Sequence, residues 1–335
     1  QQDSRGGRSG QTGFVSNGVT SPRSVGIGAP IASVVVAAGL FGTAGTAREL
    51  GPDEASSLSV GAARIALGTV VLWAVAGARR GRPSVVPRGS IRRARSLVLV
   101  GGAGVVLYTP LFFVAVDRAG VAVGTIVTIA SGPFFAGGLE WVFRRRPPTV
   151  GWFIGTSVTI GGVVLHVSAS AADRAGFDMV GVGAALAAGL GYAVYSVTTK
   201  VAIEYGLPST LALAMPFTVG TFGVVAIAWG ESFVWLTTAD GALMALYLGV
   251  VATGVAYVLF GAGLSRLTSS TVVTLVLVEP VTAALLATLL LDESIPPVGW
   301  LGLAGVVAGL WVVGRAVTPP AHELSPPAAR PTLRR

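Results

Sequence analysis

The sequence predicts an all-α polytopic membrane protein, with ten transmembrane helices arranged as two inverted five-helix repeats. Of its 335 residues, 52% are hydrophobic and 11% are charged, and the mean hydropathy is +0.75. Soluble domains contain about 25% charged residues, so this much apolar surface indicates a membrane protein. The apolar residues fall in ten runs, each of roughly the length needed to cross a hydrocarbon core about 30 Å thick. The two halves of the chain also share a pattern of prolines, glycines and tryptophans.

Charged or proline-containing segments separate the ten runs. The first five spans are predicted near residues 29–47, 57–77, 96–116, 120–142 and 150–168, and the second five near 179–199, 209–229, 242–264, 270–291 and 298–315. We expect residues 1–28 and 316–335 to be disordered cytoplasmic tails, because they are rich in Gly, Ser, Pro, Ala and Arg. The repeats are then residues 29–168 and 179–315.

The repeat is visible as matched residues about 150 positions apart. The offset is 147 for the proline pair and 148 for the Gly-Trp pair, and the tetrapeptide AAGL recurs at an offset of 150. Five spans is an odd number, so two tandem copies must cross the membrane in opposite directions. The matched positions are Pro133 with Pro280, Gly151-Trp152 with Gly299-Trp300, and Ala37–Leu40 with Ala187–Leu190.

Basic residues predict the orientation. With the N-terminus in the cytoplasm, 19 Lys and Arg residues fall on the cytoplasmic side and 3 on the other. This bias predicts a plasma (inner) membrane protein with both termini cytoplasmic. The net charge of +8 therefore reflects topology, not nucleic-acid binding. The equivalent turns of the two repeats are expected on opposite sides, with Arg144–Arg146 inside and Asp292–Glu293 outside. Such inverted repeats are a recurrent plan of secondary transporters.

Three stretches resemble the EamA-type branch of the drug/metabolite transporter superfamily. Residues 278–310 contain a proline in span nine, a run of small residues, an acidic turn with Glu293 and a glycine-rich span ten. Arg64 follows Gly51-Pro52, and residues 191–195 form an aromatic, small-residue run. The resemblance covers about residues 29–315 and departs from the family at the first turn, where Arg145 or Arg146 replaces a glutamate. It implies a carrier with a central cavity that works by alternating access, commonly an exporter of amino acids, metabolites or drugs.

Glu279 is the first candidate site residue, because it is a carboxylate near the middle of an apolar span. Ionisable groups at that depth usually have a function. Glu279 could bind a substrate ammonium group or take and release a proton; alternatively, it pairs with another helix as a structural group. Pro133 and Pro280 each remove a helical hydrogen bond, which predicts a hinge or a cavity wall. Proline is also frequent in membrane helices without such a role.

Arg64 and four tyrosines are further candidates. Arg64 could pair with a substrate carboxylate or with Glu279, or its long side chain could extend to the outer interface. Because buried phenols usually need a hydrogen-bond partner, the tyrosines could line the cavity and hold a polar substrate; alternatively, they pack between helices. The four are Tyr108, Tyr192, Tyr195 and Tyr257.

Glu140 lies near the cytoplasmic end of span four. Arg144 follows it four residues later, which favours a local ion pair at the membrane interface.

No catalytic residue, metal site or cofactor is expected. The chain has no cysteine, and its two histidines, His166 and His322, lie outside any cluster of metal-binding spacing. It has no Walker A loop and no hydrolase motif. The predicted function is a secondary transporter, and its expected partners are a small-molecule substrate and the lipid bilayer. Glu279 is the residue through which a proton could be coupled to transport; the sequence does not indicate an oligomeric state. The alternative is a membrane-embedded lipid-modifying enzyme.

Overall fold

The computed structural model describes residues 28–79, 88–145, 147–170, 178–290 and 294–317 of the chain. These residues form helices without any strand, and ten helical segments are long and apolar enough to cross a membrane. The prediction of an all-α polytopic membrane protein is therefore confirmed. The two tails and the Asp292-Glu293 turn lie outside the described residues.

The ten spans agree with the predicted ranges to within a few residues. The regular helices are α1 (Gly28–Glu49), α2 (Ser57–Arg79), α3 (Arg88–Arg144), α4 (Val150–Ser170), α5 (Met179–Glu204), α6 (Ser209–Ile227) and α11 (Pro297–Val317). Short 3-10 turns η1 (Ala228–Gly230) and η2 (Val234–Thr237) follow α6. Span eight consists of α7 (Ala239–Leu246), the π-helix η3 (Tyr247–Val255) and α8 (Ala256–Leu264). Span nine consists of α9 (Ser269–Leu275), the 3-10 turn η4 (Val276–Val278) and α10 (Glu279–Leu290).

Gly120 divides α3 into spans three and four. Its φ of 81° and ψ of 157° are not helical, and φ lies in the range that L side chains rarely adopt. A glycine at this point lets the chain leave one span and enter the next within a few residues.

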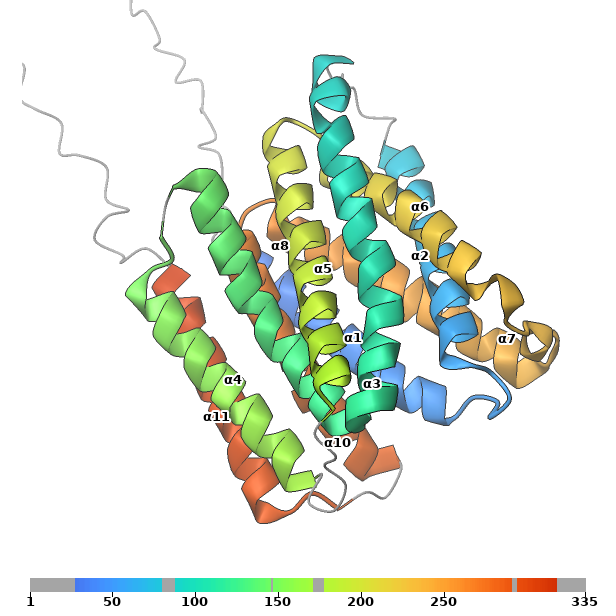
Figure 1. The fold of residues 1–335 in the computed structure, drawn as a ribbon. Coiled ribbons are helices and arrows are strands. Elements are labelled where there is room, and N and C mark those ends of the chain that lie inside the picture. Colours follow the sequence, from blue (N-terminus) through green and yellow to red (C-terminus); the bar gives the residue numbers. More distant parts are fainter. Residues whose placement is uncertain (1–27, 80–87, 146, 171–177, 291–293, 318–335) are drawn as a thin grey trace, which may run out of the picture.

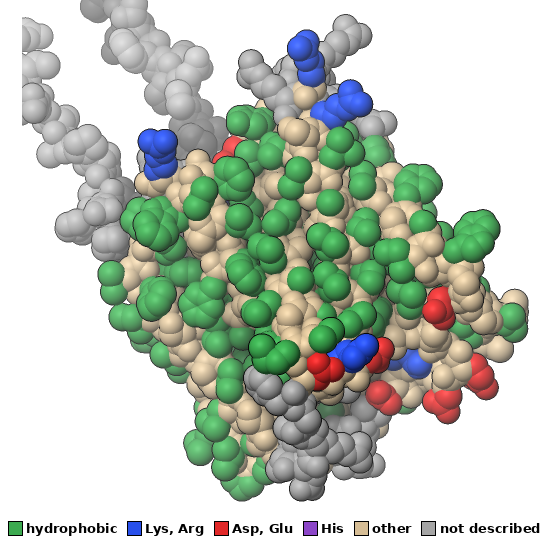
Figure 2. Space-filling view, viewed as in Figure 1, with side chains coloured by type: hydrophobic (Ala, Val, Ile, Leu, Met, Phe, Trp, Pro, Cys, Tyr) green, Lys and Arg blue, Asp and Glu red, His purple; other side chains and the backbone are tan. Residues whose placement is uncertain are grey.

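Successive spans run in alternate directions, so the described chain begins and ends at one end of the bundle (Figure 1). We call this the termini end, and the other the opposite end. Most Asp and Glu side chains visible in Figure 2 lie towards the opposite end, whereas hydrophobic side chains cover the flank of the bundle. An apolar flank between two polar ends is the surface that a lipid bilayer requires.

The helix contacts follow the same pattern in both halves. Helix α1 packs against spans eight and nine, and its counterpart α5 packs against spans three and four within α3. Helix α2 packs on η3, and its counterpart α6 packs on α3. The remaining large contacts join counterparts to each other, α2 with α6 and α4 with α11. This is the contact pattern of two like units related by an approximate two-fold axis.

Glycines allow α4 and α11 to approach closely (Figure 1). A Cβ atom on Gly155 would lie 2.8 Å from the carbonyl oxygen of Gly309, and one on Gly162 would lie 2.5 Å from that of Gly302. Gly155 and Gly162 are seven residues apart in α4, as are Gly302 and Gly309 in α11, and the two pairs meet in opposite order. The seam is thus self-complementary between the repeats, and its small residues let the backbones touch.

Lys200 corrects one assignment made from the sequence. Lys200 directly follows the predicted span at 179–199 and is one of the 19 basic residues assigned to cytoplasmic segments, but α5 continues to Glu204 and Lys200 is only 6% exposed. Its Nζ donates to the carbonyl oxygen of Leu264, 2.8 Å away, and lies 3.7 Å from a carboxylate oxygen of Glu204. These acceptors allow the ammonium group to lie inside the bundle, so the helix can extend beyond the apolar run.

Candidate functional site

Span nine changes its helical geometry just before Glu279. Pro280 has no N–H to donate to the carbonyl of Val276, four residues earlier. The N–H of Glu279 instead donates to that carbonyl, and Val276–Val278 form a 3-10 turn. Glu279 then begins α10, about midway along the 22-residue span. The proline therefore places the carboxylate at a helix break in the middle of the membrane.

Two adjoining cavities meet at Glu279. One, of about 300 Å³, extends from Glu279 at mid-depth to Arg48 and Ser57 at the opposite end of the bundle. The other, of about 70 Å³, lies further inside and includes Thr128 and Tyr192. We call the two together the central cavity; both are lined by Phe41, Ala44, Arg64, Tyr108 and Glu279.

The central cavity lies between elements of both halves. Arg64 comes from α2 and Tyr108 from α3, whereas Tyr192 comes from α5 and Glu279 from span nine. Arg64 and Glu279 therefore bring opposite charges from the two repeats to one cavity. Opposite charges in one cavity reduce the cost of holding either of them there.

Several buried polar atoms at the cavity have no hydrogen-bond partner among the described residues. They are Arg64 Nε, Thr128 Oγ1 and Tyr192 Oη, with Thr253 Oγ1 in an adjoining space of about 20 Å³. Most buried polar groups in proteins are paired, so a cluster of unpaired ones at a cavity is unusual. These atoms can donate to or accept from a polar molecule that enters.

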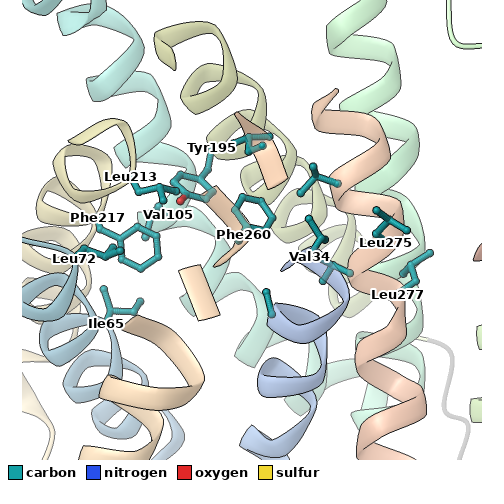
Figure 3. Close-up of a cluster of buried hydrophobic side chains, with 14 of the residues drawn as sticks. Val34, Ile65, Leu72, Val105, Tyr195, Leu213, Phe217, Phe260, Leu275 and Leu277 are labelled. Atoms are coloured by element: carbon teal, nitrogen blue, oxygen red, sulfur yellow. The ribbon is translucent and has the colours of Figure 1, made fainter. Parts of the chain in front are cut away.

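Aromatic rings form the wall of the cavity. The ring of Tyr257 lies 5.0 Å from Phe41 and 4.6 Å from Phe217 between centroids, and Tyr108 lies 5.8 Å from Tyr192. Tyr195 is only 1% exposed and packs on Phe217 within the main hydrophobic core (Figure 3). Such rings supply a large apolar surface beside the two charges.

The structure brings most of the predicted site residues together. Arg64, Tyr108, Tyr192, Tyr257 and Glu279 line the central cavity. Tyr195 lines only the small adjoining space.

The two prolines lie elsewhere. Pro133 is buried in a part of α3 that stays helical, and neither Pro133 nor Pro280 is among the residues that line these cavities. Pro280 acts on the site through the helix break beside Glu279.

Sequence reasoning missed Phe41, Thr128 and Thr253. The spans contain many other phenylalanines and threonines, so nothing in the sequence distinguished these three.

The sequence did not indicate the hydrogen-bond partners of Glu140. It is buried, only 6% exposed, and its carboxylate accepts hydrogen bonds from the start of span nine. The predicted partner, the Arg144 side chain, lies outside the described part of the structure. The two partners, Ser269 and Ser270, are visible in the sequence as a polar pair. They lie 129 and 130 residues after Glu140, so nothing in the local sequence connects them to it.

A larger groove of about 420 Å³ lies between α1, α7 and α10 at the opposite end. Its walls are mainly apolar, and Asp240 is its one charged lining residue. Size alone does not indicate the site, because a ligand needs convergent polar groups for orientation. The central cavity has them.

Ten membrane-length helices in two interlocked halves, with a charged and aromatic cavity at mid-depth, define a polytopic membrane protein of the transporter class. The model of the EamA-like transporter family matches residues 29–168 and 179–315. The chain belongs to this family.

Relatives and a solved structure agree with this assignment. The uncharacterized transporter YwfM of Bacillus subtilis strain 168 is 35% identical over 284 residues. The match covers 84% of this chain and 93% of the length of YwfM. An uncharacterized transporter of Clostridium kluyveri is 27% identical over 133 residues, covering 39% of this chain and 43% of its own. A protein crystal structure superposes with a TM-score of 0.71 at 18% identity, over 86% of this chain and 96% of that chain. The last likeness shows the fold alone.

Proposed function

We propose that the protein is a secondary transporter that exports small polar metabolites, such as amino acids, or drugs, by alternating access at the interface of the two repeats. One observation carries the proposal. A guanidinium, a carboxylate and unpartnered buried polar atoms, contributed by both halves, line one cavity halfway through the bundle. Inverted-repeat transporters hold substrate at this depth.

The lining indicates the chemistry of the substrate. Arg64 can hold a carboxylate through paired N–H donors, and Glu279 can accept from an ammonium group. The rings of Phe41, Tyr108 and Tyr257 can cover an apolar portion. A molecule with both charges and an apolar part fits these walls. A proton that binds Glu279 in one state of the cycle can couple the movement to a gradient.

Charge supports the orientation and the location. The exposed residues Arg92 and Arg95 of α3 and Arg145 after span four lie at the termini end, which we place in the cytoplasm of a plasma-membrane protein. In the proposed export, a substrate enters the cavity from the termini end and leaves from the opposite end, where the central cavity reaches Arg48 and Ser57.

Glu279→Gln tests the proposal. The variant keeps the shape of the side chain and removes its charge. We expect flux of labelled amino acids in proteoliposomes to fall roughly 10–100-fold, the effect of losing one charged hydrogen bond. The matched control is Glu54→Gln, an exposed residue at the opposite end that does not line the central cavity.

Two results would contradict the proposal. Equal flux in Glu279→Gln and in the unchanged protein would remove Glu279 from the mechanism. Conversion of bilayer lipids by the purified protein, without flux of any labelled metabolite, would support the lipid-modifying enzyme instead.

A further inference from the structure

The carboxylate of Glu140 joins the two repeats at the termini end. Its Oε1 accepts from the N–H of Ser269 at 2.6 Å, and its Oε2 accepts from the N–H of Ser270 at 3.0 Å and from the Ser270 hydroxyl at 2.6 Å. Glu140 is near the end of span four, in the first half, and the two serines begin span nine, in the second. Both carboxylate oxygens are thus committed to N–H and O–H donors of the other repeat.

Further polar contacts surround this one. The hydroxyl groups of Ser196 on α5 and Ser269 are 2.5 Å apart, and Ser196 is completely buried. Lys200, one turn further along α5, donates to the last carbonyl of α8. Spans four, six, eight and nine are therefore bonded to one another at the termini end.

The central cavity is closed on this side. Every residue from Ser269 to Leu277 is buried, and Val273 at the cavity packs on Ala136 and Val197. Towards the opposite end, the cavity reaches the ends of α1 and α2. A route to the termini end that opened between spans four and nine would break all three hydrogen bonds to Glu140.

We propose that Glu140 is a conformational latch: its carboxylate holds the start of span nine and keeps the termini end closed, and releasing it opens the cavity to that side. Glu140 is a positioning residue in this role, since it does not line the cavity. The proposal rests on the alternating access proposed above.

The carboxylate of the latch has no counterpart in the other repeat. At the offset of 147 given by the two prolines, the position that corresponds to Glu140 is Ala287. Its methyl group cannot accept a hydrogen bond. The equivalent position at the opposite end therefore lacks the acceptor, so the latch favours the state that is closed at the termini end.

The carboxylate suits its position. The first N–H groups of a helix have no partner within the helix and carry a partial positive charge, which stabilises an anion. Glu140 supplies this cap from another span. Its hydrogen bonds contribute to closure only while the two spans are together, as a latch requires.

Cysteine accessibility tests the latch without any substrate. The chain contains no cysteine, so a single introduced thiol can be followed. Val273→Cys reports access from the termini end, and Ala283→Cys, which lines the part of the cavity nearer the opposite end, reports access from there. A membrane-impermeant maleimide is applied to either side of oriented vesicles.

Glu140→Ala should raise the labelling rate of Val273→Cys from the termini side at least about tenfold and lower that of Ala283→Cys from the other side. Ser270→Ala keeps the charge and removes one of the three hydrogen bonds, so it should shift both rates in the same directions by less. Asp240→Ala is the matched control, because it removes an exposed carboxylate from the first turn of a helix, α7, at the opposite end.

Labelling rates that stay the same in folded Glu140→Ala and Ser270→Ala proteins would overturn the latch. If Glu140→Ala does not fold, Ser270→Ala alone decides. The result is independent of transport: a shift in accessibility in a protein that carries no metabolite would retain the latch and refute the proposed function.

Discussion

Glu279 and Arg64 illustrate how a charged residue can remain inside an apolar bundle. Either charge alone at mid-depth would cost several kcal/mol (about 3 on insertion scales), because hydrocarbon cannot solvate it. The two share one cavity that extends to the helix ends, so each lies beside an opposite charge and near a path for water. The arrangement leaves the Arg64 Nε and the Tyr192 hydroxyl unpartnered, which favours a ligand over a fixed internal pair.

Two Tyr→Phe variants separate binding from stability. Tyr192→Phe removes a buried hydroxyl without a partner, so we expect an unchanged or higher unfolding free energy and roughly tenfold weaker substrate binding. Tyr247→Phe removes a hydroxyl that donates to Thr43 at 2.9 Å, so unfolding should cost about 0.5–1.5 kcal/mol less, with binding unchanged.

Denaturant titration in detergent and equilibrium binding of the labelled substrate measure the two effects. If Tyr192→Phe lost stability and kept full affinity, its hydroxyl would be a packing group and the cavity would lose one proposed contact.

Isolated polar residues in apolar runs were predictable, whereas their partners were not. Arg64, Glu279 and the tyrosines stood out because few polar side chains interrupt the spans, and five of the six line the central cavity. Glu140 was visible but its environment was not, because its partners lie 129 residues away. Only tertiary packing brings such residues together.

At the scale of the element, the irregular helices differ in how far the sequence explains them. Pro280 predicts a disturbance in span nine, and the 3-10 turn before Glu279 is its result. The π-helix Tyr247–Val255 in span eight contains no proline. It packs closely on α2, where a Cβ on Gly249 would lie 2.3 Å from Leu67 and one on Gly254 would lie 2.6 Å from Val71. That geometry depends on a neighbouring helix, so local sequence could not predict it.

The glycine seam between α4 and α11 gives a prediction at this scale. A Cβ on Gly162 would meet backbone atoms of α11 at 2.5 Å, and backbone cannot move aside as a flexible side chain can. Gly162→Ala should therefore push the helices apart and reduce the unfolding free energy by about 1–3 kcal/mol. Thermal or denaturant unfolding in detergent measures it.

Gly161→Ala is the adjacent control. A Cβ at Gly161 would have no neighbour within 4 Å, so the gain in helix propensity should leave stability unchanged or raise it by up to about 1 kcal/mol. Equal destabilisation by both substitutions would show that the effect arises within α4 and not at the seam.

At the scale of the molecule, the hydropathy of the chain and the odd number of spans in each repeat determine most of the fold. All ten spans were predictable, because crossing a bilayer requires a long apolar helix whose backbone bonds internally. The pairing of α4 with α11 and of α2 with α6 was not predictable from the sequence. Lipid tails are as apolar as the side chains between the helices, so the hydrophobic pattern does not identify which helices are neighbours. Small residues and shape select the partners.

The inversion of the repeats gives the last prediction. Val150 and Val298 precede the equivalent Gly-Trp pairs, and both side chains are exposed at the start of their helices, α4 and α11. In parallel repeats these two positions would face one side of the membrane; in inverted repeats they face opposite sides. In the cysteine-free chain, Val150→Cys should react with an impermeant maleimide from the cytoplasm and Val298→Cys only from outside. Arg92→Cys, exposed near the start of α3 at the termini end, should react from the same side as Val150→Cys. Reaction of Val150→Cys and Val298→Cys from the same side would exclude inversion, and with it a cavity shared by two oppositely oriented halves; reaction of each from the side opposite to that predicted would keep the inversion and reverse the assignment of the termini end to the cytoplasm.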